Sequence, residues 1–206
     1  MLEDIALIPF IFVRHGSTNW SFDQLHLGEL DLSLNEIGIK EVQITAKKFC
    51  EIRNPIIFSS PRKRTMETAH IIAEQTKSTV HIEIGLDARF YGNFSQDSEL
   101  CQKFQKAIYK EELSRNVFEA LLPKDAEKLE VFGKRIATAI LQVIKNNHEK
   151  RPLIIVSHGE VYNGLCKHMV KEDLSINKGE CRQFFPSRCG KAGWSISEAI
   201  HACYTY

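Results

Sequence analysis

The chain has 206 residues, and its 27 lysines and arginines nearly balance its 26 aspartates and glutamates. This length suits a single domain with a sizeable core. The charge balance gives no reason to expect a nucleic acid or an anionic membrane as partner. No apolar stretch approaches the ~20 residues of a membrane-spanning helix, and the acidic start Met1–Asp4 lacks the basic region of a signal peptide. The six cysteines lack metal-site spacing, so we expect free thiols in a reducing cytoplasm. We also expect no cofactor.

The first predicted strand, residues 8–14, is apolar as far as Val13 and ends in Arg14-His15-Gly16. An arginine guanidinium matches phosphate oxygens in a two-pronged arrangement. An imidazole is largely unprotonated at neutral pH and can act as a nucleophile. Glycine lets a substrate approach the backbone closely. The end of this strand is therefore a candidate reaction centre.

A helix over 34–51 is predicted next, with Ser33 and Glu36 as a capping box. Its predicted apolar face consists of Ile37, Val42, Ile44, Ala46 and Phe49.

A short strand over 55–59 then leads into a helix over 62–76. Ser60 suits the N-cap of this helix and Pro61 its first position, where a missing N–H does no harm. Arg64 then lies just past the first turn, close to the carboxyl edge of the sheet. The neighbouring Arg62 and Lys63 are expected on a solvated basic face.

The rest of the chain continues the α/β order. Its predicted elements are a strand over 79–84, a helix over 124–147, a strand over 152–157, a helix over 160–171, and candidate edge strands at 180–185 and 194–197. Between the first two of these lies a mostly polar insert at about 85–122, which we expect to be helical after Gln96.

A second His-Gly pair repeats the design of the first. The apolar strand that starts at Leu153 ends in Ser157-His158-Gly159. If the two strands are neighbours in a parallel sheet, both histidines lie at its carboxyl edge, where such sheets bind ligands. The alternative is that both are core histidines at strand ends.

Three segments together resemble the histidine phosphatase superfamily, branch 1, which is the phosphoglycerate-mutase-like group. They are Arg14-His15-Gly16, the Ser60-x-x-x-Arg64-x-x-x-Thr68-Ala69 segment and Ser157-His158-Gly159. They come in family order, and the resemblance covers roughly residues 8–170. It implies an α/β fold with a mostly parallel central sheet and helices on both faces, a three-layer sandwich. We therefore expect one domain over 1–206, with a helical cap insert at about 85–122.

The resemblance also implies the roles of four residues. His15 would attack phosphorus and carry the phosphoryl group, while Arg14, Arg64 and His158 would hold its non-bridging oxygens. Such a cationic pocket stabilises the transferring charge without a metal. Many members have an asparagine six residues after the nucleophile; Ser21 occupies that place here and is the expected phosphate ligand, with Asn19 close by.

Two further positions depart from the family pattern. Many members have an acidic residue after Arg-His-Gly, where this chain has Ser17. Ser17 and Thr18 could either donate to phosphate or cap the following helix. Members usually place the glutamate that protonates the leaving oxygen in a Leu-x-Glu-x-x-x-Gly stretch, but Leu86–Gly92 has Ala88 there.

Two carboxylates are candidates for the missing proton donor. Asp87 is one residue away from the usual position and reaches the pocket only if the segment is an irregular loop. Glu160 follows His158-Gly159, and this arrangement resembles the His-x-Glu that some second-branch members use. Glu160 could also be only an acidic first-turn residue that the helix dipole favours.

These features predict a metal-independent phosphomonoesterase that works through a phosphohistidine on His15. The expected substrate is a phosphorylated small molecule or a phosphopeptide, with inorganic phosphate as product. Two alternatives remain open. One is a mutase of the phosphoglycerate type, and the other is a catalytically weak phosphate-binding or regulatory module, which Ala88 favours.

Overall fold

The computed structural model describes residues 8–19, 31–92, 119–120, 122–172, 174–186 and 194–198. Within them, six strands form one sheet in the order β3-β2-β4-β1-β5-β6. The strands are β1 (Phe10–Arg14), β2 (Ile56–Ser59), β3 (Val80–Ile82), β4 (Leu153–Ser157), β5 (Cys181–Pro186) and β6 (Trp194–Ser197). The helices are α1 (Glu36–Lys47), α2 (Lys63–Thr76), the short 3₁₀ turn η2 (Ile84–Leu86), α5 (Leu129–Asn146), α6 (Gly159–Leu165) and the π-helical turn η3 (Cys166–Val170).

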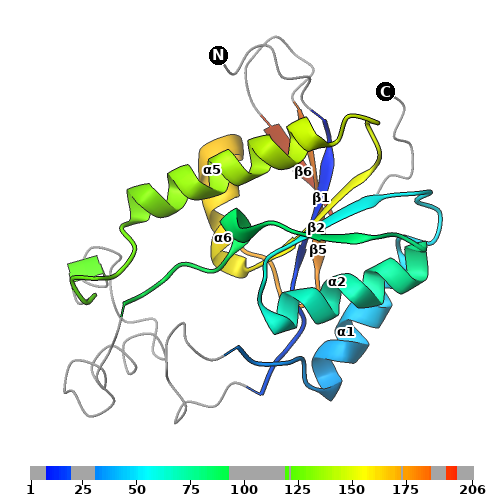
Figure 1. Cartoon of the computed structure of the whole chain (residues 1–206), viewed down its shortest axis with the longest axis horizontal. Helices are drawn as coiled ribbons and strands as arrows, with labels where there is room; N and C mark the ends of the chain where they lie inside the picture. The colour runs from blue at the N-terminus through cyan, green and yellow to red at the C-terminus, as the bar shows by residue number, and fades with distance from the viewer. Residues whose placement is uncertain are drawn as a thin grey trace.

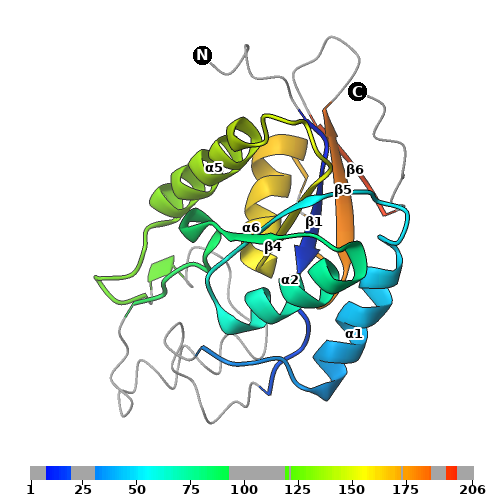
Figure 2. The same cartoon turned by 45° about the vertical axis from the view of Figure 1, so that its right-hand side comes forward.

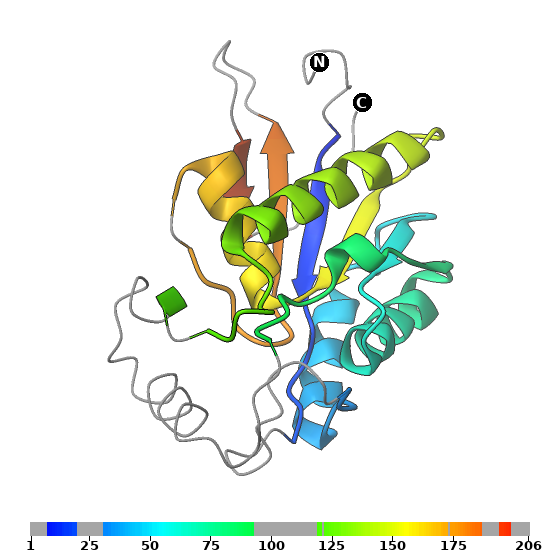
Figure 3. The same cartoon turned by 60° about the vertical axis from the view of Figure 1, so that its left-hand side comes forward.

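Four adjacent strands of the sheet are parallel, and two are antiparallel. β3, β2, β4 and β1 run in one direction, whereas β5 runs against β1 and β6 against β5. Figure 3 shows β1 and β4 side by side with their arrowheads at the same edge. Their register pairs Arg14 with Ser157, so the residues that follow, His15 and His158, leave the sheet together. The predicted adjacency of the two His-Gly strands is confirmed.

Helices cover both faces of the sheet. Figures 1 and 2 show α5 and α6 on one side and α1 and α2 on the other. Phe10 and Phe12 of β1 pack into the cluster under α5 and α6, and the alternate residues Ile11 and Val13 pack toward α1 and α2. A strand buried on both faces reads as a continuous apolar run, which is why β1 and β4 could be recognised. The predicted three-layer α/β fold is confirmed.

The start of α1 differs from the prediction. The N-cap is Asn35, whose side-chain oxygen accepts from the Gly38 N–H at 2.8 Å, so Ser33 and Glu36 form no capping box. Ile37 and Ile44 were expected on the inner face, yet each is 63% exposed. At about 3.6 residues per turn, Ile37 and Ile44 share one side of α1 and lie roughly opposite Val42 and Ala46, which are buried.

The start of α2 also differs. Its N-cap position is Arg62, which makes no side-chain capping bond. The carboxylate of Asp31 accepts instead from the Lys63 N–H at 2.7 Å. Because Asp31 satisfies this first-turn donor, Ser60 is released from the predicted capping role.

The C-terminal segment adds two strands that were both expected at the edge of the sheet. β5 is instead an inner strand between β1 and β6, and β6 is the edge. The helix predicted over 160–171 ends as α6 at Leu165 and continues as η3. Most of the proposed cap lies outside the described residues, so its helical structure stays a prediction. None of the helices described is long and apolar enough to cross a bilayer.

Candidate active site

Two buried histidines meet at the carboxyl edge of the sheet. The His15 N–H donates to the Ser157 carbonyl at 3.0 Å, which joins the loops that follow β1 and β4. The ring centroids of His15 and His158 are 5.3 Å apart. His15 is 8% exposed and His158 3% exposed. The topology therefore brings the two predicted histidines into one site.

The backbone sets the protonation of His15. Its Nδ1 lies 2.8 Å from the Gly16 carbonyl oxygen, which can only accept a hydrogen bond. Nδ1 therefore carries the ring proton, and Nε2 keeps a free lone pair. Burial, the nearby His158 and the Arg64 guanidinium lower the pKa of His15 well below its ordinary value. A neutral imidazole with a free Nε2 is suited to nucleophilic attack.

Gly16 permits the close contact between this loop and α1. A Cβ on Gly16 would lie 2.5 Å from the Gly38 carbonyl oxygen, and one on Gly38 would lie 2.1 Å from the Ser17 oxygen. The N–H and hydroxyl of Ser17 both donate to the carboxylate of Glu41, at 2.8 and 2.9 Å. Ser17 thus neither caps the helix nor has its donors free for phosphate.

Two guanidinium groups contribute positive charge. Arg14 donates from Nη1 to the Ile176 carbonyl at 2.7 Å and packs against Gly159, where an added Cβ would lie 3.0 Å from its Cζ. Arg64 approaches His158, with Nη2 3.3 Å from Nδ1. Among the described residues, neither arginine has a carboxylate within ion-pair distance. Their charge is therefore not neutralised within this part of the chain.

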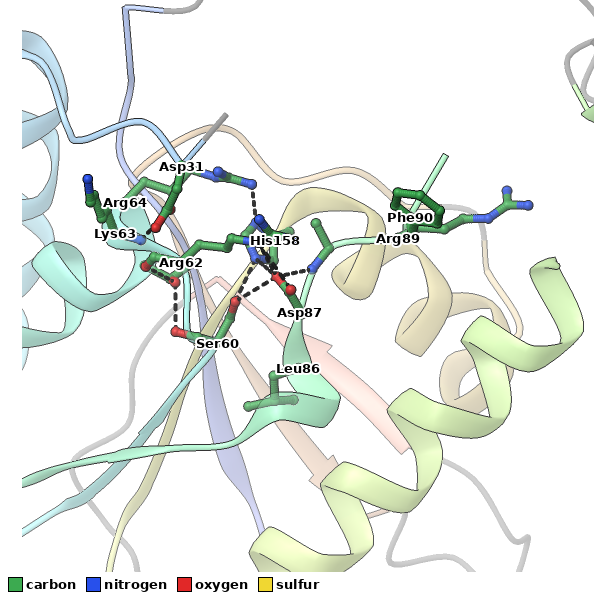
Figure 4. Close-up of polar contacts among 12 residues, drawn as sticks. Asp31, Ser60, Arg62, Lys63, Arg64, Leu86, Asp87, Arg89, Phe90 and His158 are labelled. Atoms are coloured by element: carbon green, nitrogen blue, oxygen red, sulfur yellow. Dashed lines mark hydrogen bonds and ion pairs between the residues drawn. The ribbon is translucent and has the colours of Figure 1, made fainter. Parts of the chain in front are cut away.

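Side chains, rather than backbone, hold the His158 ring. A guanidinium only donates, so Nδ1 accepts from Arg64 and Nε2 carries the proton. This Nε2 lies 2.8 Å from the Ser60 hydroxyl oxygen, and the hydroxyl donates to Asp87 Oδ1 at 3.3 Å. Figure 4 shows Arg64 above the His158 ring, and Ser60 and Asp87 below it. Burial lowers the pKa of His158 to about 4.

Asp87 is held as a carboxylate by several donors. Arg62 Nε lies 2.8 and 3.0 Å from its two oxygens, and the Ala88 N–H donates at 2.8 Å. Burial by itself raises the pKa of Asp87, but the nearby His158 and the hydrogen bonds from Arg62 outweigh it and hold this pKa well below the ordinary value. The expectation that Arg62 only faces solvent is wrong, because Asp87 binds it.

Glu160 occupies the first turn of α6, beside the pocket. Burial raises the pKa of Glu160, while hydrogen bonds from Tyr91 and the Arg89 N–H oppose that rise. The Arg89 N–H lies 3.3 Å from Glu160 Oε2. The Arg89 guanidinium is engaged by Glu119 at 2.6 and 2.7 Å. This carboxyl is thus easier to protonate than that of Asp87.

A pocket of about 260 Å³ gathers most of the predicted site residues. Its lining consists of Arg14, His15, Arg64, Ala88, His158, Gly159, Glu160, Asn163, Ser175 and Ile176. Asp87 does not line it and lies on the Ser60 side of His158. Asn19 is exposed, and Ser21 lies outside the described residues.

Two participants in this arrangement were not predicted. Ser60 was assigned to a helix cap and Arg62 to a solvated face, yet both contact Asp87. The serine belongs to the family motif, which was a usable signal for Ser60. Nothing in the sequence separated Arg62 from its basic neighbours. Within the described ranges, no three His, Cys, Asp or Glu side chains are grouped to hold a metal ion.

Comparison with known proteins gives a consistent result. The family model for the histidine phosphatase superfamily (branch 1) matches residues 10–183. Phosphoglycerate mutase-like protein 4 of Arabidopsis thaliana is 31% identical over 170 residues, covering 79% of this chain and 71% of the relative. The metal-independent phosphoserine phosphatase of the same plant is 28% identical over 159 residues, covering 75% and 66%.

Solved structures share the fold at lower identity. The phosphoglycerate mutase of Bacillus anthracis has a TM-score of 0.74 at 18% identity, covering 96% of this chain and 94% of the other. A mycobacterial glucosyl-3-phosphoglycerate phosphatase complexed with VO3 has a TM-score of 0.72 at 17% identity, covering 92% and 97%. The motif pattern, the fold and the family match agree, and the chain belongs to branch 1 of the histidine phosphatase superfamily.

Proposed function

We propose that this protein is a metal-independent phosphomonoesterase that works through a phosphohistidine on His15. The observation that carries the proposal is the state of His15. Its Nδ1 donates to a backbone carbonyl, and its free Nε2 belongs to a pocket lined by two guanidinium groups. Phosphoryl transfer to a side chain requires a neutral nucleophile and positive charge that is not held in an ion pair.

The first half-reaction uses both. His15 Nε2 forms a bond to phosphorus as the bond from phosphorus to the leaving oxygen breaks. Donors of Arg14, Arg64 and His158 stabilise the charge on the three non-bridging oxygens. Protonated Glu160 gives its proton to the leaving oxygen, so the product departs as an alcohol.

The second half-reaction restores the enzyme. The Glu160 carboxylate takes a proton from a water molecule, whose oxygen attacks phosphorus while the bond to Nε2 breaks. Inorganic phosphate leaves, and Glu160 is again protonated. One carboxyl group serves as acid and then as base, as reversibility of the two steps requires.

Glu160 is preferred to Asp87 for this role on two grounds. Glu160 lines the pocket, whereas Asp87 lies beyond His158. Burial raises the pKa of Glu160, whereas the partners of Asp87 lower the pKa of Asp87. A group that stays ionised at neutral pH is a poor proton donor.

The substrate is proposed to be a phosphorylated small molecule or a phosphopeptide. Relatives named as a metal-independent phosphoserine phosphatase and as a 2,3-bisphosphoglycerate-dependent phosphoglycerate mutase support small metabolites, and the latter keeps the mutase alternative open. Ala88, which lines the pocket in place of the usual glutamate, is the observation that favours a weak phosphate-binding module. Free thiols at Cys50 and Cys181 suit the cytoplasmic location proposed from the sequence.

Turnover and trapping together test these functions. The protein is assayed with p-nitrophenyl phosphate and with phosphoserine, and with 3-phosphoglycerate in the presence and absence of 2,3-bisphosphoglycerate. Hydrolysis supports the phosphatase, and isomerisation that needs the bisphosphate supports the mutase instead. Absence of both, with phosphate still bound, supports the binding module. An acid-labile, base-stable phosphoryl label should form on the wild-type chain and be absent from His15→Ala.

A further inference from the structure

We propose that Asp87 is a positioning residue. Acting through the Ser60 hydroxyl, it orients the His158 ring and offsets the positive charge that this ring takes up when it donates to a bound phosphoryl group. The inference rests on the proposed function and adds to it a role for a residue outside the pocket.

The geometry brings these three groups together in one cluster. The Asp87 carboxylate accepts from the Ser60 hydroxyl at 3.3 Å, and the Ser60 oxygen lies 2.8 Å from His158 Nε2. Asp87 Oδ1 is itself 3.6 Å from the same Nε2. Figure 4 shows Ser60 and Asp87 on the same side of the His158 ring. Ser60 is fully buried.

The contacts with Ser60 and Asp87 determine which nitrogen of His158 is left to face a ligand. Ser60 and Asp87 do not line the pocket, whereas Arg64, the partner of Nδ1, does. In the free protein the proton is on Nε2, and Nδ1 is an acceptor. An anionic phosphoryl oxygen cannot donate to Nδ1, so a proton must lie on Nδ1 before His158 can bind this oxygen. The Asp87 carboxylate beside Nε2 disfavours moving the existing proton away from that nitrogen, so the ring takes up a second proton instead. The ring then carries a charge with a proton on each nitrogen.

The charged groups around His158 show which of them favours uptake of a second proton by the ring. Arg64 from α2, Arg62 before it, and His15 from the end of β1 all disfavour a charged ring. Glu160 from α6 lines the same pocket and is the proposed proton carrier. Asp87 is the described carboxylate that faces Nε2. A bound dianion on the Nδ1 side and Asp87 on the Nε2 side would therefore hold the imidazolium between two negative groups.

Arg62 fixes Asp87 in this position. Its Nε contacts both carboxylate oxygens, at 2.8 and 3.0 Å. Arg64, which contacts His158, makes no ion pair within the described residues, so no carboxylate there takes the donors that a phosphoryl group needs. The residue expected to be solvated thus orients the network.

Binding of sulfate tests the inference without turnover. Sulfate is a tetrahedral dianion that carries no proton at neutral pH, so any proton taken up belongs to the protein. Calorimetry gives its affinity, and ¹⁵N spectra of the histidine rings give the protonation of each His158 nitrogen. We expect a neutral His158 with the proton on Nε2 in the free protein, and both nitrogens protonated in the sulfate complex.

Two variants remove different members of this cluster of contacts. Asp87→Asn keeps the shape and removes the charge, and Ser60→Ala removes the connecting hydroxyl while leaving the pair of Arg62 and Asp87. Each should weaken sulfate binding by roughly ten- to a hundredfold, the usual effect of losing a buried charged hydrogen bond. His158 in their complexes should be protonated only at lower pH. Glu130→Gln, which removes an exposed carboxylate from α5, is the matched control and should bind as wild type does.

The results that overturn the inference are specific. Wild-type affinity in both variants, or a His158 that stays neutral in the wild-type sulfate complex, excludes the positioning role. If Asp87→Asn does not fold, Ser60→Ala still decides. Selective slowing of alkyl phosphates with unchanged sulfate binding would instead make Asp87 the proton donor. A chain that shows the expected sulfate response but hydrolyses no phosphomonoester refutes the proposed function alone.

Discussion

The two strand ends of the site follow one sequence design but are completed in different ways. At the end of β1, a backbone carbonyl fixes the His15 ring, at 2.8 Å from Nδ1. At the end of β4, the side chains of Ser60 and Arg64 hold the His158 ring. The carbonyl fixes the proton on Nδ1, and burial together with His158 and Arg64 lowers the pKa of His15, so the ring stays neutral with a free Nε2. A ring with a carboxylate beside it can take up a proton when an anion binds, which suits His158 to binding.

Replacement of the two histidines should separate these roles most strongly. His15→Ala should lower turnover of p-nitrophenyl phosphate by more than about 10³-fold, because no other group can carry the phosphoryl group. His158→Asn should lose roughly 10²–10³-fold, typical of one removed oxyanion donor. Steady-state rates and the phosphoryl label compare the two histidine variants. Of these two, only His158→Asn should still form the label.

The exposed residue His148 provides the matched control, since His148→Ala removes an imidazole far from the pocket chemistry. Its rate should equal that of wild type. Activity above a tenth of wild type in His15→Ala would remove His15 as the nucleophile.

The proton donor provides the next largest effect. Glu160→Gln should slow alkyl phosphates by roughly 10²–10⁴-fold but p-nitrophenyl phosphate far less, because nitrophenolate leaves without a proton. Burial raises the pKa of Glu160, so the wild-type rate on alkyl phosphates should fall as pH rises through that raised pKa, and this limb should vanish in the variant. Rates measured with a series of leaving groups test the first effect, and rates measured over a series of pH values test the second.

Asp87→Asn is the matched comparison, because it replaces the other candidate carboxylate. We expect it to affect good and poor leaving groups alike. If neither amide variant discriminates between leaving groups, Ala88→Glu should raise alkyl-phosphate turnover. Good wild-type turnover that survives both amides would place the acid on another residue.

Acid should destabilise the fold through His158. Burial lowers its pKa from 6.5 to about 4, so between these values the unfolded chain binds more protons than the folded chain. Stability therefore falls as pH drops from 6.5 to 4, by about 2–3 kcal/mol from this group at pH 4.5. Urea unfolding at pH 7 and 4.5 should show a smaller loss in His158→Asn than in wild type. An unchanged loss would contradict the buried neutral ring.

The fold and the site were predictable to different degrees. β1 and β4 could be recognised because strands buried on both faces are continuously apolar, and their His-Gly ends placed both histidines at one edge. The arginines of the pocket followed from motifs with fixed spacing to these strands. Local patterns of this kind depend on few neighbours.

The choice among competing polar partners could not be predicted. Ser33 and Asn35 are both good N-caps, and the structure uses Asn35. Ser60 was equally suited to cap a helix, but Asp31, distant in sequence, supplies the carboxylate that satisfies the Lys63 N–H. Arg62 binds Asp87 because two loops meet at the sheet edge. Such pairings depend on tertiary proximity, which a single sequence does not contain.

The glycines after the two histidines provide a direct test of the difference between the ends of β1 and β4, with the smallest expected effect. A Cβ on Gly16 would lie 2.5 Å from a backbone oxygen of α1, whereas one on Gly159 would lie 3.0 Å from the end of the Arg14 side chain. Backbone cannot move aside without displacing the helix, but a side chain can.

Gly16→Ala should therefore lower the free energy of unfolding by about 1–3 kcal/mol, as overpacking does. Gly159→Ala should cost less stability and instead weaken phosphate binding by shifting the Arg14 guanidinium. Gly164→Ala, where the nearest atom lies 3.7 Å away, serves as control. Denaturant unfolding and phosphate titration of the three variants measure the two effects, and equal destabilisation by Gly16→Ala and Gly159→Ala would contradict this difference between backbone and side-chain neighbours.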